Sequence, residues 1–177
     1  PWLRITDPAG VLTVNTNDSR AAEAVIPAPL TGTYIVEVAA YAPNASYGTV
    51  GDYRLTLALG AGAFTVPAGD EGGAMTNGVH HVGRIEQGDI DMWSFTVCQN
   101  QVITVQMTEI PSVPDPQFYP WLAINGPTGG LVTLQTNASA AVGTFTATVP
   151  GLYTVRAAAY TPNNIYATSG DYTIRVD

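Results

Sequence analysis

The chain has 177 residues, of which 46% are hydrophobic, and this is enough apolar material for a packed core. Its formal net charge is -8, and it contains no lysine, the six basic residues being singly spread arginines. An acidic chain without a basic cluster argues against binding to nucleic acid or to anionic membrane surfaces. No run approaches about 18 consecutive apolar residues, so no membrane insertion is expected.

The first predicted strand lies in "PWLRI" at the start of the chain. Successive strand side chains point to opposite faces, so Leu3 and Ile5 are expected in the core and Trp2 on the other face. The phrase returns as "PWLAI", in which Trp121 is the outward equivalent. These tryptophans are candidate contact aromatics for a partner. The alternative is that they shield a strand edge or fill a contact between modules.

The chain repeats itself at an offset of about 119 residues. The stretch "GTYIVEVAAYAPNASYGTVGDYRLTL", which begins at Gly32, returns as "GLYTVRAAAYTPNNIYATSGDYTIRV", which begins at Gly151. Residues 1–59 therefore duplicate residues 120–177, whereas residues 60–119 have no earlier copy. The chain holds about one and a half repeats.

The strongest alternation of apolar and polar residues lies in the unduplicated segment, in "IDMWSFTV" and "QVITVQM". In the first run, Trp93, Phe95 and Val97 share the face that is expected to be buried. Similar runs follow at 144–149, 153–159 and 172–176, each bounded by turn-forming residues. With 18 Gly and 13 Pro, helices longer than a turn or two are not expected. The pattern predicts an all-β sandwich or barrel.

Four ordered motifs, "HVGRIEQGDIDMWSFTV", "PWLAINGPTG", "PGLYTVRAAAY" and "SGDYTIRV", resemble the bacterial pre-peptidase C-terminal (PPC) module. The resemblance implies antiparallel jelly-roll-like β-sandwich modules in tandem, and the collagen-binding domains of secreted bacterial collagenases are relatives. We therefore expect residues 60–177 to form a complete module and residues 1–59 to be the second half of another. "PWLRI" is then a mid-module strand, and the chain is expected to be a piece of a longer protein.

The resemblance also implies a candidate calcium site, because relatives can hold calcium with acids from the linker and from the turn before the aromatic strand. The corresponding residues here are Asp70, Glu71 and Asn77 in the linker and Asp89 and Asp91 in the turn. Oxygen ligands from two loops suit calcium. This linker is less acidic than that of calcium-binding relatives, so the favoured interpretation is that Asp89 and Asp91 cap a turn. No cofactor is then required, and calcium dependence is expected to be weak or absent.

The sequence shows no catalytic motif. His80 and His81 are adjacent on an expected strand and would point to opposite faces, which disfavours a shared zinc ion. Ser94 and Cys98 lack the surroundings of an activated nucleophile. The sequence therefore predicts a protein that is not an enzyme.

Three sequons make Asn17, Asn44 and Asn137 candidates for glycosylation, and Asn17 and Asn137 are expected at equivalent positions of the two copies. The loops that carry Tyr47 and Tyr166 suit either glycans or ligand contact, and these tyrosines complete the set of candidate contact aromatics. The alternative for both loops is a solvated hairpin.

The expected function is a non-enzymatic structural repeat of a bacterial extracellular or cell-surface protein, which forms a stalk or fibre from tandem or head-to-tail modules. The alternative is an accessory module that holds a secreted hydrolase on a protein or polysaccharide. The expected partners are neighbouring copies, as a head-to-tail homopolymer or as upstream repeats, with glycans a further candidate. Because a half sandwich cannot bury its inner face alone, the isolated chain is expected to aggregate or polymerise.

Overall fold

The structure is a computed structural model that describes two compact units of β-strands, unit 1 (Pro1–Leu55) and unit 2 (Thr56–Asp177). The described residues are 1–17, 22–42, 45–46, 50–55, 57, 64–86, 89–111, 119–161, 164–165 and 168–177. All secondary-structure elements within them are strands, which confirms the all-β prediction. Over these same ranges, no helix is long and apolar enough to span a membrane.

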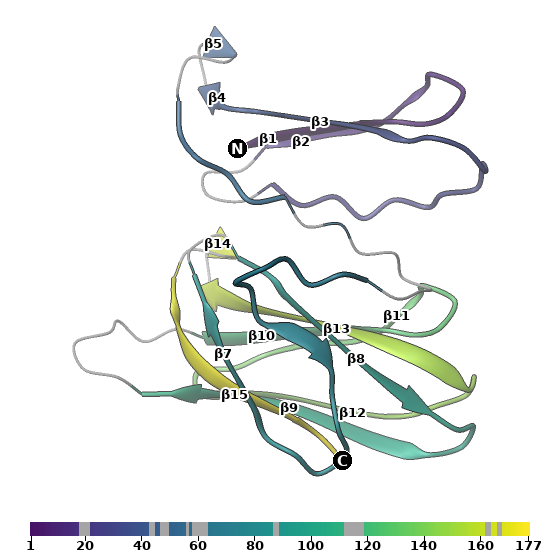
Figure 1. Ribbon diagram of the computed structural model, residues 1–177, viewed down its shortest axis with the longest axis vertical. Helices are drawn as coiled ribbons and strands as arrows, with labels where there is room; N and C mark the ends of the chain where they lie inside the picture. Colours follow the sequence, from purple (N-terminus) through teal and green to yellow (C-terminus); the bar gives the residue numbers. More distant parts are fainter. Residues whose placement is uncertain are drawn as a thin grey trace. The chain divides into compact units, whose positions relative to one another are not determined.

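Unit 2 is a two-layered sandwich (Figure 1). One sheet has the order β11 (Leu131–Thr136), β10 (Tyr119–Asn125), β13 (Gly151–Thr161), β8 (Asp91–Val97), β6 (Gly72–Ala74), with β14 (Asn164–Ile165) beside β13. The other sheet has the order β12 (Ala140–Thr146), β9 (Val102–Ile110), β15 (Gly170–Val176), β7 (His81–Ile85). The strand pairs are antiparallel apart from β6 with β8, which is parallel. The predicted β-sandwich is confirmed.

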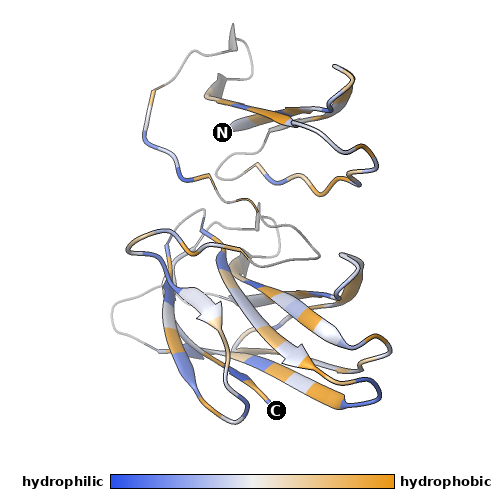
Figure 2. Ribbon diagram, turned by 45° about the vertical axis from the view of Figure 1, so that its right-hand side comes forward, coloured by the Kyte–Doolittle hydropathy of each residue, from blue (hydrophilic) through white to orange (hydrophobic). Residues whose placement is uncertain are grey.

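The core of unit 2 lies between these two sheets. Each sheet contributes the apolar residues of one face, and the alternation along the strands is visible in Figure 2. The largest contributors are Trp93, Phe95, Leu122, Ile124, Val155, Ile85, Val105, Met107, Tyr172 and Ile174. Trp93, Phe95 and Val97 are buried as predicted, but Met92 on the opposite face of β8 is buried as well.

The strand predicted at 144–149 is shifted in the structure. β12 begins at Ala140, ends at Thr146 and pairs with β9 along its whole length. Its first half, "AAVG", consists of small residues with little strand preference, apart from one valine. The partner strand, and not the local side chains, therefore decides where β12 begins.

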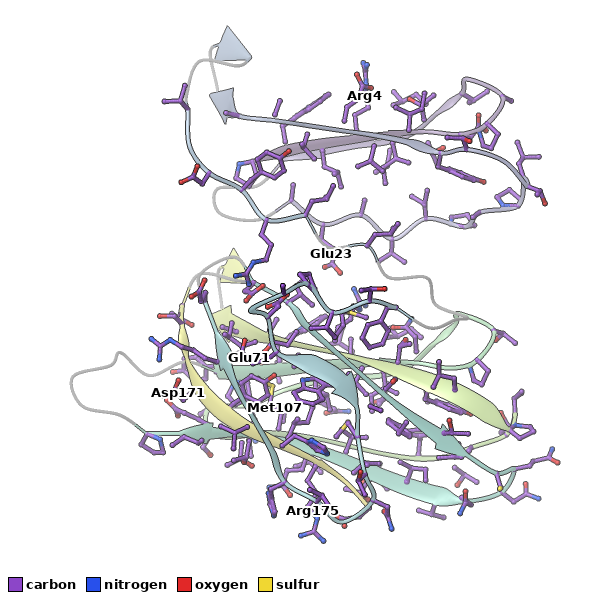
Figure 3. The ribbon with its side chains drawn as sticks, in the orientation of Figure 1. Arg4, Glu23, Glu71, Met107, Asp171 and Arg175 are labelled. Carbon is purple, nitrogen blue, oxygen red and sulfur yellow. The ribbon has the colours of Figure 1, made fainter. Side chains whose placement is uncertain are left out.

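Unit 1 contains a three-stranded antiparallel sheet of order β2 (Leu12–Asn17), β1 (Trp2–Thr6), β3 (Ile35–Ala39). A small hairpin follows, formed by β4 (Tyr41–Ala42) and β5 (Ala45–Ser46). Leu3 and Ile5 are buried, as predicted. Arg4 projects from one face of this sheet (Figure 3).

The registers of the two copies agree strand by strand. Trp2 lies opposite Asn17 and Ala39 in unit 1. Trp121 lies opposite Thr136 and Ala158 in unit 2, 119 residues further along in each case. An irregularity in the first hairpin follows Ile5 in one copy and Ile124 in the other. The sequence repeat is therefore also a structural repeat.

Candidate metal centre

Three carboxylates of unit 2 lie close together. Candidate ligand atoms of Asp70, Glu71 and Asp91 are all within 4.8 Å of one another. Asp91 is fully buried, whereas Asp70 and Glu71 are partly exposed. Glu71 is labelled in Figure 3. Three of the five residues proposed from the sequence are thus brought into one group.

The parallel pairing of β6 with β8 brings these acids together. Gly72 lies opposite Met92 in this pairing, and Asp70 and Glu71 immediately precede Gly72 just as Asp91 precedes Met92. A Cβ atom on Gly72 would lie 2.2 Å from the carbonyl oxygen of Met92, and the φ of Gly72 is +141°. Only glycine fits this close approach, so the glycine fixes the register that aligns the acids.

Asp91 is held by a hydrogen-bonded network that joins the two sheets. The Tyr172 hydroxyl on β15 donates to Asp91 Oδ2 at 2.5 Å. The indole Nε1 of Trp93 donates to the same Tyr172 oxygen at 2.8 Å. The other carboxylate oxygen, Asp91 Oδ1, is buried and has no hydrogen-bond partner among the residues that the structure describes. A buried polar atom without a partner is costly and calls for a ligand or a proton.

Burial raises the pKa of Asp91 to about 8, and the hydrogen bond from Tyr172 opposes this rise. The neighbouring carboxylates of Asp89, Glu71 and Asp70 raise it further. Burial also raises the pKa of Tyr172, so its hydroxyl stays protonated and donates to Asp91. Ionisation of Asp91 is therefore costly at neutral pH unless a positive charge lies beside its carboxylate.

The chemistry of this donor set fits a hard divalent cation. Carboxylate oxygens are the ligands that calcium and magnesium prefer, whereas zinc prefers nitrogen and sulfur. Three carboxylates cover part of the six to eight oxygen ligands that calcium takes, and backbone carbonyls or water would supply the rest. A cation here would give Asp91 Oδ1 a partner and would favour the ionised carboxylate. The residues present therefore fit calcium.

Asp89 is not a member of this group, although its charge acts on Asp91. Asp89 is buried, and its Oδ1 accepts a hydrogen bond from the backbone N–H of Ile90 at 2.9 Å. Asn77 is exposed in a turn. The turn-capping interpretation fits Asp89 but is wrong for Asp91, whose carboxylate bonds to a tyrosine of the opposite sheet.

The other candidate residues are placed as follows. Asn137 is exposed after β11, Asn17 ends β2, and Asn44, Tyr47 and Tyr166 lie outside the described residues. The register places Asn17 opposite Trp2 but Thr136 opposite Trp121, so the expected equivalence of Asn17 and Asn137 is wrong by one residue. Glycosylation stays a prediction at all three sites.

The candidate contact tryptophans differ in exposure. Trp2 is partly exposed, whereas Trp121 is 4% exposed. Each carries an arginine over its ring, with the guanidinium carbon 5.6 Å from the ring centroid for Arg4 on Trp2 and 5.4 Å for Arg156 on Trp121. The expected outward, contact-making position of Trp121 is therefore wrong, because its ring is buried, whereas partner contact through Trp2 stays a prediction.

The structure places the two histidines and the cysteine in different surroundings. His81 Nε2 accepts a hydrogen bond from the backbone N–H of Thr76 at 3.1 Å, and its ring packs on Trp93. His80 lies outside β7 and its Nε2 is 3.4 Å from Arg175. Cys98 is exposed and has a free thiol just after β8.

Sequence reasoning missed the partners of Asp91. Strand alternation places Tyr172 on the same face as Ile174 and Val176, so its inward direction could have been inferred. Its contact with Asp91 and Trp93 could not, because these residues belong to strands of different sheets.

No family model and no curated protein match the chain. Among the solved structures that are similar to the chain, two each match 61% of it. One is the pre-peptidase C-terminal domain of a collagenase from Bacillus anthracis, with 16% identity, a TM-score of 0.46 and 96% of that chain covered. The other is CorA, a surface-associated copper-binding protein important in copper acquisition by Methylomicrobium album BG8, with 9% identity, a TM-score of 0.48 and 98% covered.

Proposed function

We propose that this chain is a non-enzymatic structural repeat of a bacterial extracellular or cell-surface protein, in which tandem β-sandwich modules form a stalk or fibre. The observation that carries the proposal is the duplicated half-module, whose strands keep the same register in both copies. Repeated units of one fold, joined in sequence, build extended assemblies. The acidic, lysine-free composition suits a surface that repels anionic membranes and nucleic acid.

Within this role, the carboxylates of Asp70, Glu71 and Asp91 form a calcium site. Calcium bound there joins the segment that enters the module to β8, at the buried end of the network with Tyr172. Extracellular modules commonly bind calcium with dissociation constants of about 10⁻⁴–10⁻³ M, which matches a site of few carboxylates. The ion would stiffen the point at which one module leads into the next.

Thermal unfolding with chelator and with calcium at several times this dissociation constant tests the site. Calcium should raise the Tm of unit 2 by about 5 °C or more, because it binds the folded state alone. Asp91→Asn should abolish the shift while keeping an acceptor for Tyr172. The exposed acid Asp171 provides the matched control, and Asp171→Asn should keep the full shift. An equal shift in both variants, or none in the parent chain, would exclude the site.

The structural role is tested on the native protein. Electron microscopy should show a beaded rod, and sedimentation with collagen fibrils, cellulose or chitin should show no saturable binding. Saturable binding that Trp2→Ala weakens would instead support the accessory-module alternative. Val82→Ala, which shortens an exposed side chain of β7, is the control for this assay.

A further inference from the structure

The two copies of the half-module differ in a systematic way. In unit 2, strands β10, β11, β13 and β14 pair only with one another or with β8. Their equivalents in unit 1 are all present, as β1, β2, β3 and the β4–β5 hairpin. Residues 22–27 correspond to β12, and residues 51–55 and 57 correspond to β15, yet none of these is a strand. In unit 2, β12 pairs with β9, and β15 pairs with β9 and β7. Both β7 and β9 come from the unduplicated segment.

Side-chain exposure shows the same dependence. Tyr53 is 72% exposed and Leu57 is also 72% exposed, whereas their equivalents Tyr172 and Val176 are 0% and 4% exposed. Leu55, equivalent to the fully buried Ile174, is 50% exposed. These side chains have core chemistry, but the sheet that would cover them is not supplied by residues 1–59. Exposed apolar surface of this kind marks an interaction site.

Within the described part of the chain, one edge of the unit 1 sheet also lacks a counterpart of β8. β13 pairs with β8 along Gly151–Ala157, and the equivalent residues 32–38 include most of β3. In the three-stranded sheet of unit 1, β3 pairs with β1 and is an edge strand. An edge strand presents unpaired N–H and C=O groups to any incoming strand.

The number of first and second half-modules in the chain indicates which segment would cover this surface. The chain contains two second halves, residues 1–59 and 120–177, but one first half, residues 60–119. If copies of these 177 residues exchange strands, second halves still outnumber first halves by two to one. One second half per copy is then left without a first half. A copy limited to these 177 residues therefore brings no spare first half to this surface.

We propose that the half-module of residues 1–59 is a docking surface for a separate first half-module of the same type as residues 60–119, supplied from outside these 177 residues. Its β8-like strand adds to the free edge of β3, and its β7- and β9-like strands pair with residues 51–57. This is strand addition to an open sheet edge, with backbone hydrogen bonds for affinity and alternate side chains for specificity. The inference goes beyond the proposed role, because it follows from the duplication whatever the module does.

The register of unit 2 specifies the contacts. Val155 lies opposite Trp93 and Tyr153 lies opposite Phe95. The same register places a tryptophan of the incoming strand opposite Val36 and a phenylalanine opposite Tyr34. Val36 is exposed and Tyr34 partly exposed in unit 1, as this docking requires.

Residues 60–119 of this chain can themselves serve as the first half-module that tests the proposal. Residues 60–119 joined ahead of Pro1 recreate the native junction, because Tyr119 is then followed by Pro-Trp-Leu as it is at Pro120. Hydrogen–deuterium exchange should slow by about 100-fold or more at residues 51–57 and approach the rate at residues 170–176. The two segments differ in sequence, so their peptides are resolved within one sample.

The matched control carries Trp93→Asp and Phe95→Asp in the added copy alone, and should leave exchange at residues 51–57 fast. If the extension does not fold, a synthetic peptide of residues 89–97 added to the unextended chain is the second probe. It should bind saturably and slow exchange in β3, and the peptide with Trp93→Asp should do neither.

Unchanged exchange with both probes, while residues 170–176 stay protected, would overturn the proposal. Slowing that rises with the concentration of the unextended chain would also overturn it, by assigning the surface to a second copy. Neither outcome bears on whether the native protein is a rod or a ligand-binding module, so the two proposals fail separately.

Discussion

At the scale of single residues, the two copies show which features the half-module requires. The Tyr34 hydroxyl donates to the carbonyl of Leu30 at 3.3 Å, and the equivalent Tyr153 hydroxyl donates to Val149 at 2.9 Å. This local bond survives in the incomplete copy, because both partners come from the same half.

Each copy has an arginine over its tryptophan ring, but the arginine comes from a different strand in each copy. In unit 1 it is Arg4, whose guanidinium also bonds Glu37 on the facing strand. In unit 2 the position equivalent to Arg4 is Ala123, and Arg156, equivalent to Glu37, covers the ring. The arginine lies on β1 in unit 1 and on β13 in unit 2, and in both copies it contacts the tryptophan ring.

Trp93 is the residue whose truncation should cost most in unit 2. Its ring is buried, and its Nε1 donates to Tyr172. Trp93→Ala should lower the free energy of unfolding by about 3–5 kcal/mol, through lost transfer energy and an unfilled cavity. Trp93→Phe keeps most of the apolar volume and should cost less. Urea unfolding measures both, and a loss below about 1 kcal/mol for the alanine variant would show that the face is not buried.

At the scale of strands, local alternation predicted those with strong side-chain patterns. β8, β9, β13 and β15 were predicted to within a few residues, because β-branched and aromatic residues alternate along them. β6 has the sequence Gly-Gly-Ala and was not predictable, since its position depends on the backbone of β8. The acids of the candidate site were proposed from the PPC resemblance, whereas their grouping depends on this unpredicted strand.

The pairing of β7 with β15 depends on a missing side chain. Gly83 lies opposite Tyr172, and a Cβ atom there would lie 2.5 Å from the tyrosine ring. Gly83→Ala should therefore destabilise unit 2 by about 1–3 kcal/mol, as overpacking does. Gly130 has open space around its Cα, so Gly130→Ala is the matched control and should change stability little. Equal stability of the two variants in urea would show that Tyr172 moves aside without cost.

At the scale of the whole molecule, two similar sequences fold in two contexts. The strands that need partners within their own half form in both units, and those that need residues 60–119 form in unit 2 alone. The repeat was visible in the sequence, and so was the lack of a first half for residues 1–59. Sequence could not show which strands would be lost, because that depends on which segments pair across the sandwich.

The central claim is that residues 1–59 are a half-module whose missing partner strands leave residues 51–55 and 57 uncovered. Native-state hydrogen–deuterium exchange on the 177-residue chain compares these residues with their equivalents, residues 170–176, in the same molecule. We predict that backbone amides at residues 51–57 exchange at least about 100-fold faster than those of β15, because their counterparts bond to β7 and β9. Equal protection of the two segments would contradict the claim.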